Sequence, residues 1–380
     1  MATGFQSTAY ESIPREIHPE SGSQVTQLTS APAISDHIYC EVPYMDPASR
    51  YIIYVRKHDS VGPTTLWRAD LERNYVTRVS DPLQDLRGIG VSPDQKYFYC
   101  LHRTGERSFE ILRLDIATLE EEQYAFEDQV LNPRTMGSVT PDLRYYINSA
   151  YLGDGRFGIL RFDLLNRTHA VIWNQDHEMC NAHPQIDPGG TDIMIQHNRD
   201  SIIDETGRMV RPFGEIGKTI YLIDINGQNH RTLPWGKPHT WPTQGHQCWI
   251  GKTHGILSTV SGGPRERLAA EGNILALWPD ADAPVPVGKG FFFVHPNASR
   301  DGRFWTSDER PGGRIIVGSF KTGKCRVLCE SHSSFSRPQY SHPHPYYSPD
   351  SKWVIFNSDR TGVPQVYAAS VPDGLLESLE

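Results

Sequence analysis

The sequence has no long apolar run, no block of basic residues and no CxxC pair. Residues 1–22 contain no apolar segment of signal-peptide length, and no run is long enough to cross a bilayer, so we expect a cytoplasmic protein without a membrane partner. The net charge of −8 and the scattered basic residues argue against a nucleic-acid partner. Of the six cysteines only Cys325 and Cys329 are close in sequence, and we interpret them as packed thiols.

Glycine and proline are abundant instead, with 32 and 28 residues among 380, as expected for many short strands joined by turns. A turn motif followed by an apolar run recurs along the chain, for example "SPDQKYFYC" from Ser92 and "SPDSKWVIF" from Ser348. Seven copies, two of them weaker, are 46 to 49 residues apart, with one interval of 63. Such a period is typical of repeat folds with four strands per unit. The aligned turn positions are Pro47, Pro93, Pro141, Pro188, Gly251, Arg300 and Pro349.

This repeat predicts an all-β fold, a single seven-bladed β-propeller formed by residues 1–380. Within it, residues 1–22 are an N-terminal extension, residues 23–30 a closing strand, and the blades begin at about residue 37. The last copy lacks a clear outer strand, whereas "SQVTQLTS" (23–30) resembles the outer strands of other copies. If this segment pairs into the last blade, it removes the free edge of an open ring. The long interval indicates an insertion at 201–217.

Histidine recurs at one position of the repeat. His183, His246, His295 and His344 each lie five residues before a turn position, at the entry to the innermost strand of four consecutive units. We expect these side chains to meet near the central axis, although a single histidine at a strand start is more often a turn or packing residue. His342 precedes His344 by two residues, and the prolines that follow each histidine keep the segment extended, so both side chains should point to one side.

A metal site is the hypothesis that these residues favour. Gln339, His342 and His344 lie within six residues, and His295 of the neighbouring unit could complete a set of three imidazoles and one amide oxygen. Imidazole suits Zn, Ni, Cu or Fe, while an oxygen ligand and open water positions also allow Mn. No carboxylate or thiolate belongs to the set, so the residues alone do not single out one metal.

At these residues the chain resembles the oligogalacturonate lyases, seven-bladed propellers that cleave short uronate oligosaccharides by β-elimination. The similar segments are "QYSHPHPYYSPDSKWVIFNSDRTGVPQVYAASVP", "GHQCW", "VHPNASRDG" and "IYLIDINGQNHR". The resemblance implies that Gln339, His342, His344 and His295 bind a divalent metal, typically manganese. It also implies that His246 is the catalytic base.

The resemblance departs at one position. Where the family has an arginine before a strand, this chain has Thr219, and the neighbouring Lys218 is a candidate substitute. Lysine offers a point charge rather than the two-pronged guanidinium of arginine.

The chemistry divides between the metal and a separate imidazole. A metal on the uronate carboxylate stabilises the charge that develops as the C5 proton leaves, and a neutral imidazole can accept that proton. We expect His246 to face the metal cluster across a gap of substrate size, without being a ligand. The alternative for His246 is a packed channel residue.

Four residues are the candidate substrate-binding groups: His183, His197, Arg199 and Lys218. His183 is also a candidate second acid or base. A solvated loop position is the alternative for Arg199, and a surface charge is the alternative for Lys218.

Three functions stay open at this point. The first is a metal-dependent lyase on oligogalacturonate-like substrates, and the second is the same chemistry on another uronate, such as rhamnose-linked glucuronate. The third is a non-catalytic propeller that binds a protein or peptide. The aligned histidines favour an enzyme, since a protein-binding face more often shows aromatic residues and arginine. The oligomeric state stays unknown.

Overall fold

The computed structural model describes residues 7–58, 62–83, 86–105, 108–126, 132–337 and 339–380. Strands dominate these residues, so the predicted all-β class is confirmed, and the one α-helix among them is α1 (Arg265–Glu271). None of the described helices is long and apolar enough to cross a membrane. The described 3₁₀ helices are η1 (His177–Met179), η2 (Gln339–Ser341) and η3 (Glu377–Leu379).

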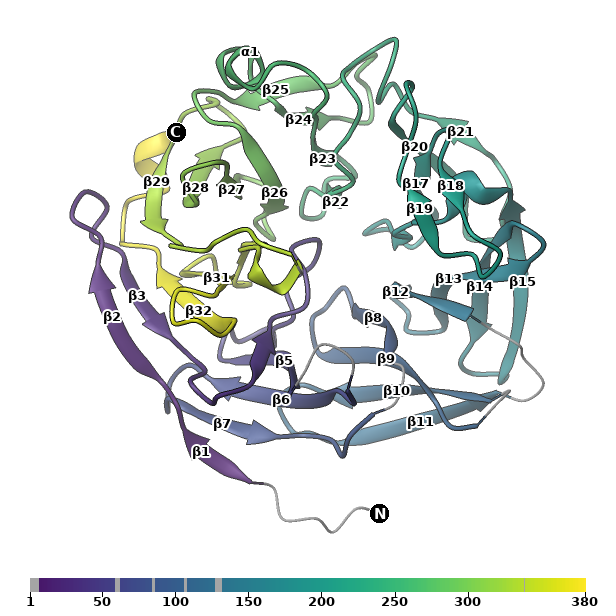
Figure 1. The fold of residues 1–380 in the computed structure, drawn as a ribbon, viewed down its shortest axis with the longest axis horizontal. Helices are drawn as coiled ribbons and strands as arrows, with labels where there is room; N and C mark the ends of the chain where they lie inside the picture. Colours follow the sequence, from purple (N-terminus) through teal and green to yellow (C-terminus); the bar gives the residue numbers. More distant parts are fainter. Residues whose placement is uncertain (1–6, 59–61, 84–85, 106–107, 127–131, 338) are drawn as a thin grey trace.

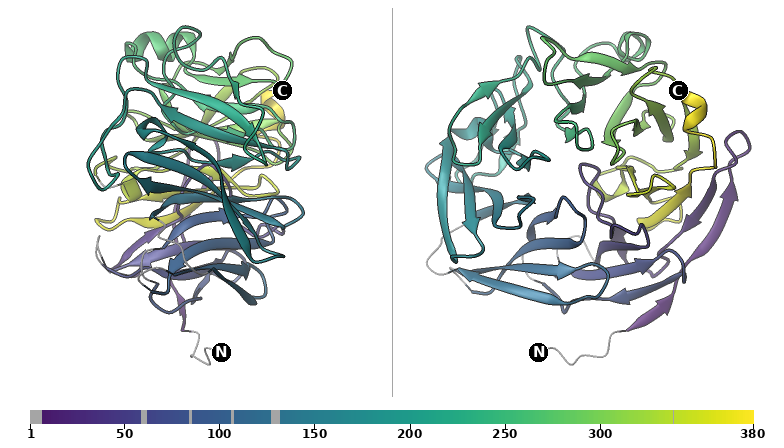
Figure 2. Two further views of the ribbon diagram at one scale, coloured as in Figure 1. Left: turned by 90° about the vertical axis from the view of Figure 1, so that its right-hand side faces the viewer. Right: turned by 180° about the vertical axis from the view of Figure 1, so that it is seen from behind.

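Most strands belong to antiparallel units of four, which lie side by side in a ring (Figure 1). Figure 2 shows the same ring from the side and from behind. In chain order the units are β4 (Ile34–Asp36), β5 (Tyr51–Lys57), β6 (Thr65–Asp70) and β7 (Tyr75–Arg78); β8 (Arg87–Val91), β9 (Tyr97–Arg103), β10 (Phe109–Asp115) and β11 (Glu121–Phe126); β12 (Asn132–Val139), β13 (Tyr145–Gly153), β14 (Arg156–Asp163) and β15 (Thr168–Gln175); β16 (Gln185–Ile186), β17 (Asp192–Asn198), β20 (Lys218–Asp224) and β21 (Arg231–Thr232); β22 (Cys248–Trp249), β23 (Ile256–Thr259), β24 (Ile274–Leu277) and β25 (Val285–Gly288); β26 (Phe293–Ala298), β27 (Phe304–Glu309), β28 (Arg314–Ser319) and β29 (Cys325–Glu330); and β30 (Tyr346–Tyr347), β31 (Trp353–Ser358) and β32 (Gln365–Ser370) with β3 (Gln24–Gln27).

Two features interrupt this regular order. The inner strands β8 and β12 pair in parallel, with Met136 opposite Ile89, so two units share one sheet. The strands β18 (Ile202–Ile203) and β19 (Met209–Arg211) form a separate hairpin between β17 and β20. This hairpin lies within the predicted insertion at 201–217.

The N-terminal strands lie along the outside of the ring (Figure 1). β3 pairs antiparallel with β32, with Val25 opposite Ala369, and β2 (Ile13–Ile17) pairs with the other edge of β3. β1 (Thr8–Tyr10) pairs instead with β7 of the first unit. The residues before 23, which we expected to be only an extension, therefore add two strands to the sheets.

The recurring Pro-Asp motif forms the turn after an inner strand. The Asp94 carboxylate accepts a hydrogen bond from the backbone N–H of Lys96 at 3.1 Å, and Asp142 and Asp350 accept the equivalent bond at the same distance. An aspartate side chain stabilises such turns because it binds the backbone two residues on. The turn therefore fixes where each inner strand ends. It also fixes the height along the ring axis at which the residue five positions earlier lies.

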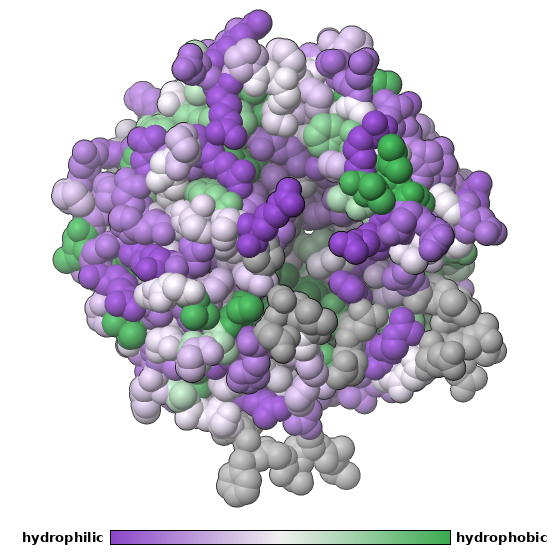
Figure 3. Space-filling model, in the orientation of Figure 1, coloured by the Kyte–Doolittle hydropathy of each residue, from purple (hydrophilic) through white to green (hydrophobic). Residues whose placement is uncertain are grey.

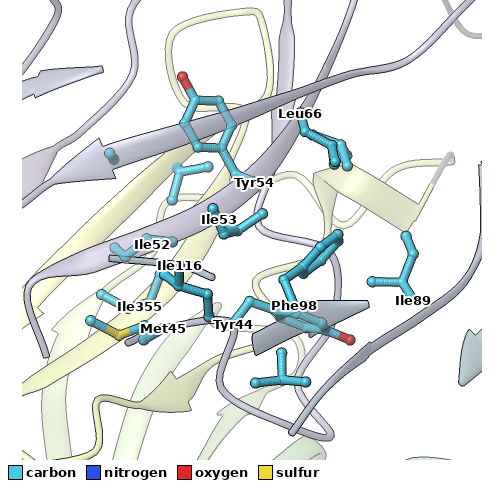
Figure 4. Close-up of a cluster of buried hydrophobic side chains, with 14 of the residues drawn as sticks. Tyr44, Met45, Ile52, Ile53, Tyr54, Leu66, Ile89, Phe98, Ile116 and Ile355 are labelled. Atoms are coloured by element: carbon cyan, nitrogen blue, oxygen red, sulfur yellow. The ribbon is translucent and has the colours of Figure 1, made fainter. Parts of the chain in front are cut away.

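Apolar side chains fill the space between neighbouring units (Figure 4). In the cluster shown, Ile53 and Leu66 of the first unit, Phe98 of the second and Ile355 of the last are all fully buried. Burial of one such side chain stabilises a fold by roughly 1.5–3 kcal/mol. Hydrophobic packing therefore holds the last unit against the first.

Candidate metal centre and active site

Three histidines meet at the entry to two neighbouring inner strands. His295 lies on β26, and His342 and His344 lie between η2 and β30. One ring nitrogen of each lies within 4.8 Å of the others. The ring centroids of His295 and His344 are 4.0 Å apart, and that of His342 is 5.6 Å from both. The structure thus brings together three of the four predicted metal ligands.

Several nitrogens of this three-histidine cluster are buried without a hydrogen-bond partner. They are both ring nitrogens of His344 and Nδ1 of His342. A buried polar atom without a partner costs about 1–3 kcal/mol, which a bound cation would offset. Burial, together with neighbouring imidazoles, lowers the pKa of both His295 and His344 well below the usual value, so their lone pairs stay available. This donor set fits a divalent transition metal.

A carboxylate holds His295 from the side away from this cluster. Asp308 on β27 accepts a hydrogen bond from Nδ1 of His295 at 2.7 Å and another from its backbone N–H at 2.8 Å. The proton therefore lies on Nδ1, and Nε2 is left as the ligand atom. Burial raises the pKa of Asp308 to about 7, against the lowering effect of the bond from His295. We had not predicted Asp308, because it lies on the second strand of its unit, outside the register of the histidines.

Gln339, the fourth predicted ligand, is exposed at the start of η2. The backbone carbonyl of Gln339 accepts a hydrogen bond from the backbone N–H of His342 at 2.8 Å, which ties η2 to the histidine segment. Its role as a metal ligand stays a prediction.

His246 lies beside the cluster and keeps a free nitrogen. Its Nδ1 donates to the carbonyl of Val294 at 3.0 Å, which leaves the lone pair on Nε2. Burial, with His295 and Lys218, lowers the pKa of His246 well below its usual value. The ring centroids of His246 and His295 are 4.3 Å apart. The predicted substrate-sized gap is therefore wrong, because neighbouring inner strands bring equivalent imidazoles into direct contact.

A loop of the first unit brings two further groups to the histidines. The ring centroid of Tyr39 lies 4.7 Å from that of His344, 5.6 Å from His183 and 6.1 Å from His246. Burial raises the pKa of Tyr39 well above its usual value, so the hydroxyl keeps its proton. Glu41 is buried, and its Oε1 lies 2.8 Å from Nδ1 of His183. We missed both residues because the first unit has no histidine at the repeat position, although "YCE" precedes it directly.

The backbone at two of the histidines is left-handed. His183 has φ of 45° and His344 has φ of 46°, and Gly88, at the same repeat position, has φ of 55°. This conformation suits glycine, and for other residues it costs of order 1–3 kcal/mol. Strain of this kind is concentrated at functional sites, and here it occurs at two of the four histidines that share the repeat position.

Lys218 lies beside the candidate base rather than on an exposed strand edge. It begins β20 and is half-buried, and its Nζ donates to the carbonyl of Gln244 at 2.9 Å. Burial lowers the pKa of Lys218 to about 8. Its charge contributes to the low pKa of His246, which places the two side chains in one electrostatic environment.

His197 and Arg199 belong to a different cluster. Nε2 of His197 lies 3.1 Å and Nε of Arg199 lies 3.2 Å from the same oxygen of Glu178. The ring of Tyr221 lies 5.4 Å from that of His197. The structure does not group these two residues with the three-histidine cluster, and substrate binding by them stays a prediction.

The centre of the ring is hollowed. Figure 3 shows the hollow on one face, bordered largely by hydrophilic residues. A cavity of about 450 Å³ is lined by turn residues of several inner strands, among them Pro93, Pro141 and Pro188. Because the histidines lie at the other end of these strands, the cavity and the three-histidine cluster are separate. Glu41 lines the cavity and also binds His183.

Comparison with known proteins shows both fold and family. No protein-family model matches the chain. A curated oligogalacturonate lyase of Dickeya dadantii (strain 3937) is 37% identical over 393 residues, which covers 93% of this chain and 95% of the relative. A solved oligogalacturonate lyase in complex with manganese has a TM-score of 0.73 at 18% identity and covers 97% of this chain and 99% of its own. The β-propeller domain of the trilobed protease from Pyrococcus furiosus has a TM-score of 0.52 at 11% identity, covering 88% and 95%.

The solved structures establish a propeller fold. The identity to the curated relative extends over nearly the whole of both chains, which is more than a shared fold requires. The chain belongs to the oligogalacturonate lyase family.

Proposed function

We propose that this protein is a metal-dependent lyase that cleaves oligogalacturonate-like oligosaccharides by β-elimination. The observation that carries the proposal is the combination of three clustered imidazoles with a separate imidazole whose Nε2 is free. The family supports the substrate class, because the curated relative is an oligogalacturonate lyase. Neither the other uronate nor a protein partner is favoured by these comparisons.

Manganese is the metal that we propose, held by His295, His342, His344 and Gln339. The unpartnered nitrogens of the cluster and the bond from His295 to Asp308 support a cation here, and a solved relative is in complex with manganese. When bound, the cation would stabilise negative charge on the carboxylate of the uronate.

His246 is the proposed base. Its Nε2 would take the C5 proton of the uronate, and the electrons of the C5–H bond would form the double bond between C4 and C5. The C4–O4 bond would then break, with its electrons leaving on O4. The low pKa of His246 keeps the ring neutral and therefore able to accept the proton.

The leaving O4 needs a proton. His183 is a proposed acid or sugar-binding group, because buried Glu41 lies 2.8 Å from its Nδ1 and orients its ring. Tyr39 stays protonated and lies against His183 and His246. Lys218, His197 and Arg199 are proposed to contact other parts of the oligosaccharide.

We infer further that the units form one seven-bladed propeller domain over the whole chain, with β3 as the closing strand of the last blade. The pairing of Val25 with Ala369 supports the closure. The shared hydrophobic cluster of Ile53 and Ile355 supports contact between the first and last blades. A closed ring leaves no free sheet edge at that junction.

The test is the appearance of product from purified protein. Oligogalacturonate, rhamnose-linked glucuronate oligomers and a neutral oligosaccharide are each incubated with the protein and Mn²⁺, and the absorbance of the unsaturated uronate is followed. We expect a signal from oligogalacturonate alone, and its loss on chelation. A signal only from the glucuronate oligomers would move the assignment to the other uronate. No signal from any uronate would contradict the lyase.

A further inference from the structure

Arg310 lies at the edge of the three-histidine cluster. Among the described residues Asp308 attracts it electrostatically, but no carboxylate lies within ion-pair distance of it. Arg310 directly follows β27, and its Nη2 lies 3.2 Å from Nε2 of His342. Its Nε is buried and has no hydrogen-bond partner. The guanidinium carbon lies 4.7 Å from the ring centroid of Phe335, which holds the group over an aromatic face. The side chain is therefore positioned at the cluster, yet part of its donor capacity is unused.

The neighbouring acidic residues are occupied. Asp308 accepts two hydrogen bonds from His295, and Glu309 accepts one from Nε of Arg314 at 2.6 Å. Within the residues that the structure describes, no carboxylate forms an ion pair with Arg310. A half-buried guanidinium that makes no direct ion pair is unusual, because a buried charge is normally paired, and here Asp308 acts on Arg310 only from a distance.

Metal binding by His342 would remove the contact that Arg310 now makes. A neutral imidazole that binds a cation through one nitrogen carries its proton on the other. Nε2 of His342 would therefore either bind the cation or be protonated, and in neither case could it accept a hydrogen bond from Arg310. The guanidinium of the metal-loaded protein consequently needs another acceptor.

A carboxylate matches this need, since its two oxygens can accept two parallel N–H bonds from a guanidinium. We propose that Arg310 binds the carboxylate of a uronate next to the metal ligands. The inference rests on the proposed function, because a uronate supplies the carboxylate. Lys218 is less suited to this role, since it already donates to Gln244 and offers only a point charge.

Binding of a charged and an uncharged ligand tests the proposal directly. The protein carries His246→Ala to prevent turnover and is loaded with Mn²⁺. Calorimetry then measures the Kd of trigalacturonate and of its methyl ester. Arg310→Gln should weaken binding of the acid by about 10- to 100-fold and leave binding of the ester nearly unchanged.

Two further variants make the result specific. Arg310→Lys keeps the charge but not the paired donors, so it should weaken acid binding less than Arg310→Gln, and it serves if the glutamine variant does not fold. Arg265→Gln is the matched control, because Arg265 is exposed and close enough to influence the pKa of Arg310. Loss of this charge should change acid binding only slightly.

The proposal is overturned if Arg310→Gln binds the acid as tightly as its parent, or loses acid and ester equally. It is also overturned if a Mn²⁺ titration shows that Arg310→Gln no longer binds the metal. Arg310 would then position the metal-binding histidines rather than bind the uronate. Failure of the proposed function is seen separately, as an absence of unsaturated product from the unsubstituted protein, whereas the charge-specific binding difference would remain measurable.

Discussion

Two groups of potential metal ligands occur in the described part of the chain, and their donor atoms differ in what they already bind. One is the three-histidine cluster, and the other consists of Asp176, Glu178 and His197. In the second group, Asp176 accepts from the backbone N–H of Glu178 at 3.0 Å, and Glu178 accepts from that of Asp200 at 2.6 Å. Glu178 also pairs with His197 and Arg199.

The ligand atoms of the second group already accept hydrogen bonds or form ion pairs within the protein, whereas both ring nitrogens of His344 are buried without a partner. Ligand residues within reach of one another are therefore not enough to indicate a metal site. The lone pairs must also be left over after local hydrogen bonding, because a cation has to displace whatever they already bind. By this criterion the three-histidine cluster, rather than the second group, is the proposed metal site.

Removal of one cluster ligand should have the largest effect. His344→Ala should abolish Mn²⁺ binding and turnover, because His344 is fully surrounded by protein and contributes two of the unpartnered nitrogens. Calorimetric titration with Mn²⁺ and the absorbance assay measure the two losses. As a control, the unsubstituted protein should lose activity on chelation and regain it with Mn²⁺. A variant that still binds one equivalent of Mn²⁺ would remove His344 from the site.

Replacement of the proposed base should separate catalysis from metal binding. His246→Ala should lower kcat by about 10²–10⁴-fold, the usual contribution of a general base, because no imidazole remains to take the C5 proton. Its Mn²⁺ stoichiometry should match that of the unsubstituted protein. Near-normal kcat would show that the base is another residue, with His183 and Lys218 the next candidates.

The positions of the histidines could be predicted from the sequence because the repeat makes them equivalent. Each lies five residues before a turn, and an aspartate side chain stabilises this turn after His183, His295 and His344. The period therefore predicts that the four histidines lie at one height along the ring axis. The contact between His246 and His295 could not be predicted, since it depends on how closely neighbouring inner strands approach.

Other residues of the site could not be predicted from the sequence repeat. Tyr39 and Glu41 come from the first unit and meet His344 of the last unit and His183 of the fourth. Asp308 and Arg310 lie on and after a second strand, where the repeat carries no histidine. These contacts are made between units or across one sheet. The sequence repeat predicts only where a residue lies within its own unit, and not which residues of other strands or units it contacts.

Loss of the carboxylate behind His295 should weaken the metal site without destroying it. Asp308→Asn keeps an oxygen that can accept the Nδ1 proton but loses the charge that makes the imidazole a stronger ligand. Metal affinity should fall about 10- to 100-fold. Titration with Mn²⁺ measures it, and activity should recover at high Mn²⁺. Unchanged affinity would mean that Asp308 only positions the strand.

The pH profile should report the environment of His246. Because its pKa is lowered, the neutral form persists to lower pH, and kcat/KM should fall on the acid side only below the usual imidazole range near ~6.5. Lys218→Met removes a positive charge that contributes to this lowering, so the acid limb should move to higher pH. Lys218→Arg should leave the limb in place. A limb that does not respond to Lys218→Met would mean that another group titrates.

The smallest effect is expected at the second group. Glu178→Gln keeps one oxygen for the backbone N–H of Asp200 but loses the charge that pairs with His197 and Arg199. Glu178 and His197 are partly exposed, so the free energy of unfolding should fall by about 1 kcal/mol or less. Denaturant unfolding measures this loss, and a Mn²⁺ titration should show unchanged affinity and stoichiometry. If the variant instead loses an equivalent of Mn²⁺, Glu178 is a metal ligand in spite of its partners, and unpartnered lone pairs do not distinguish the two groups.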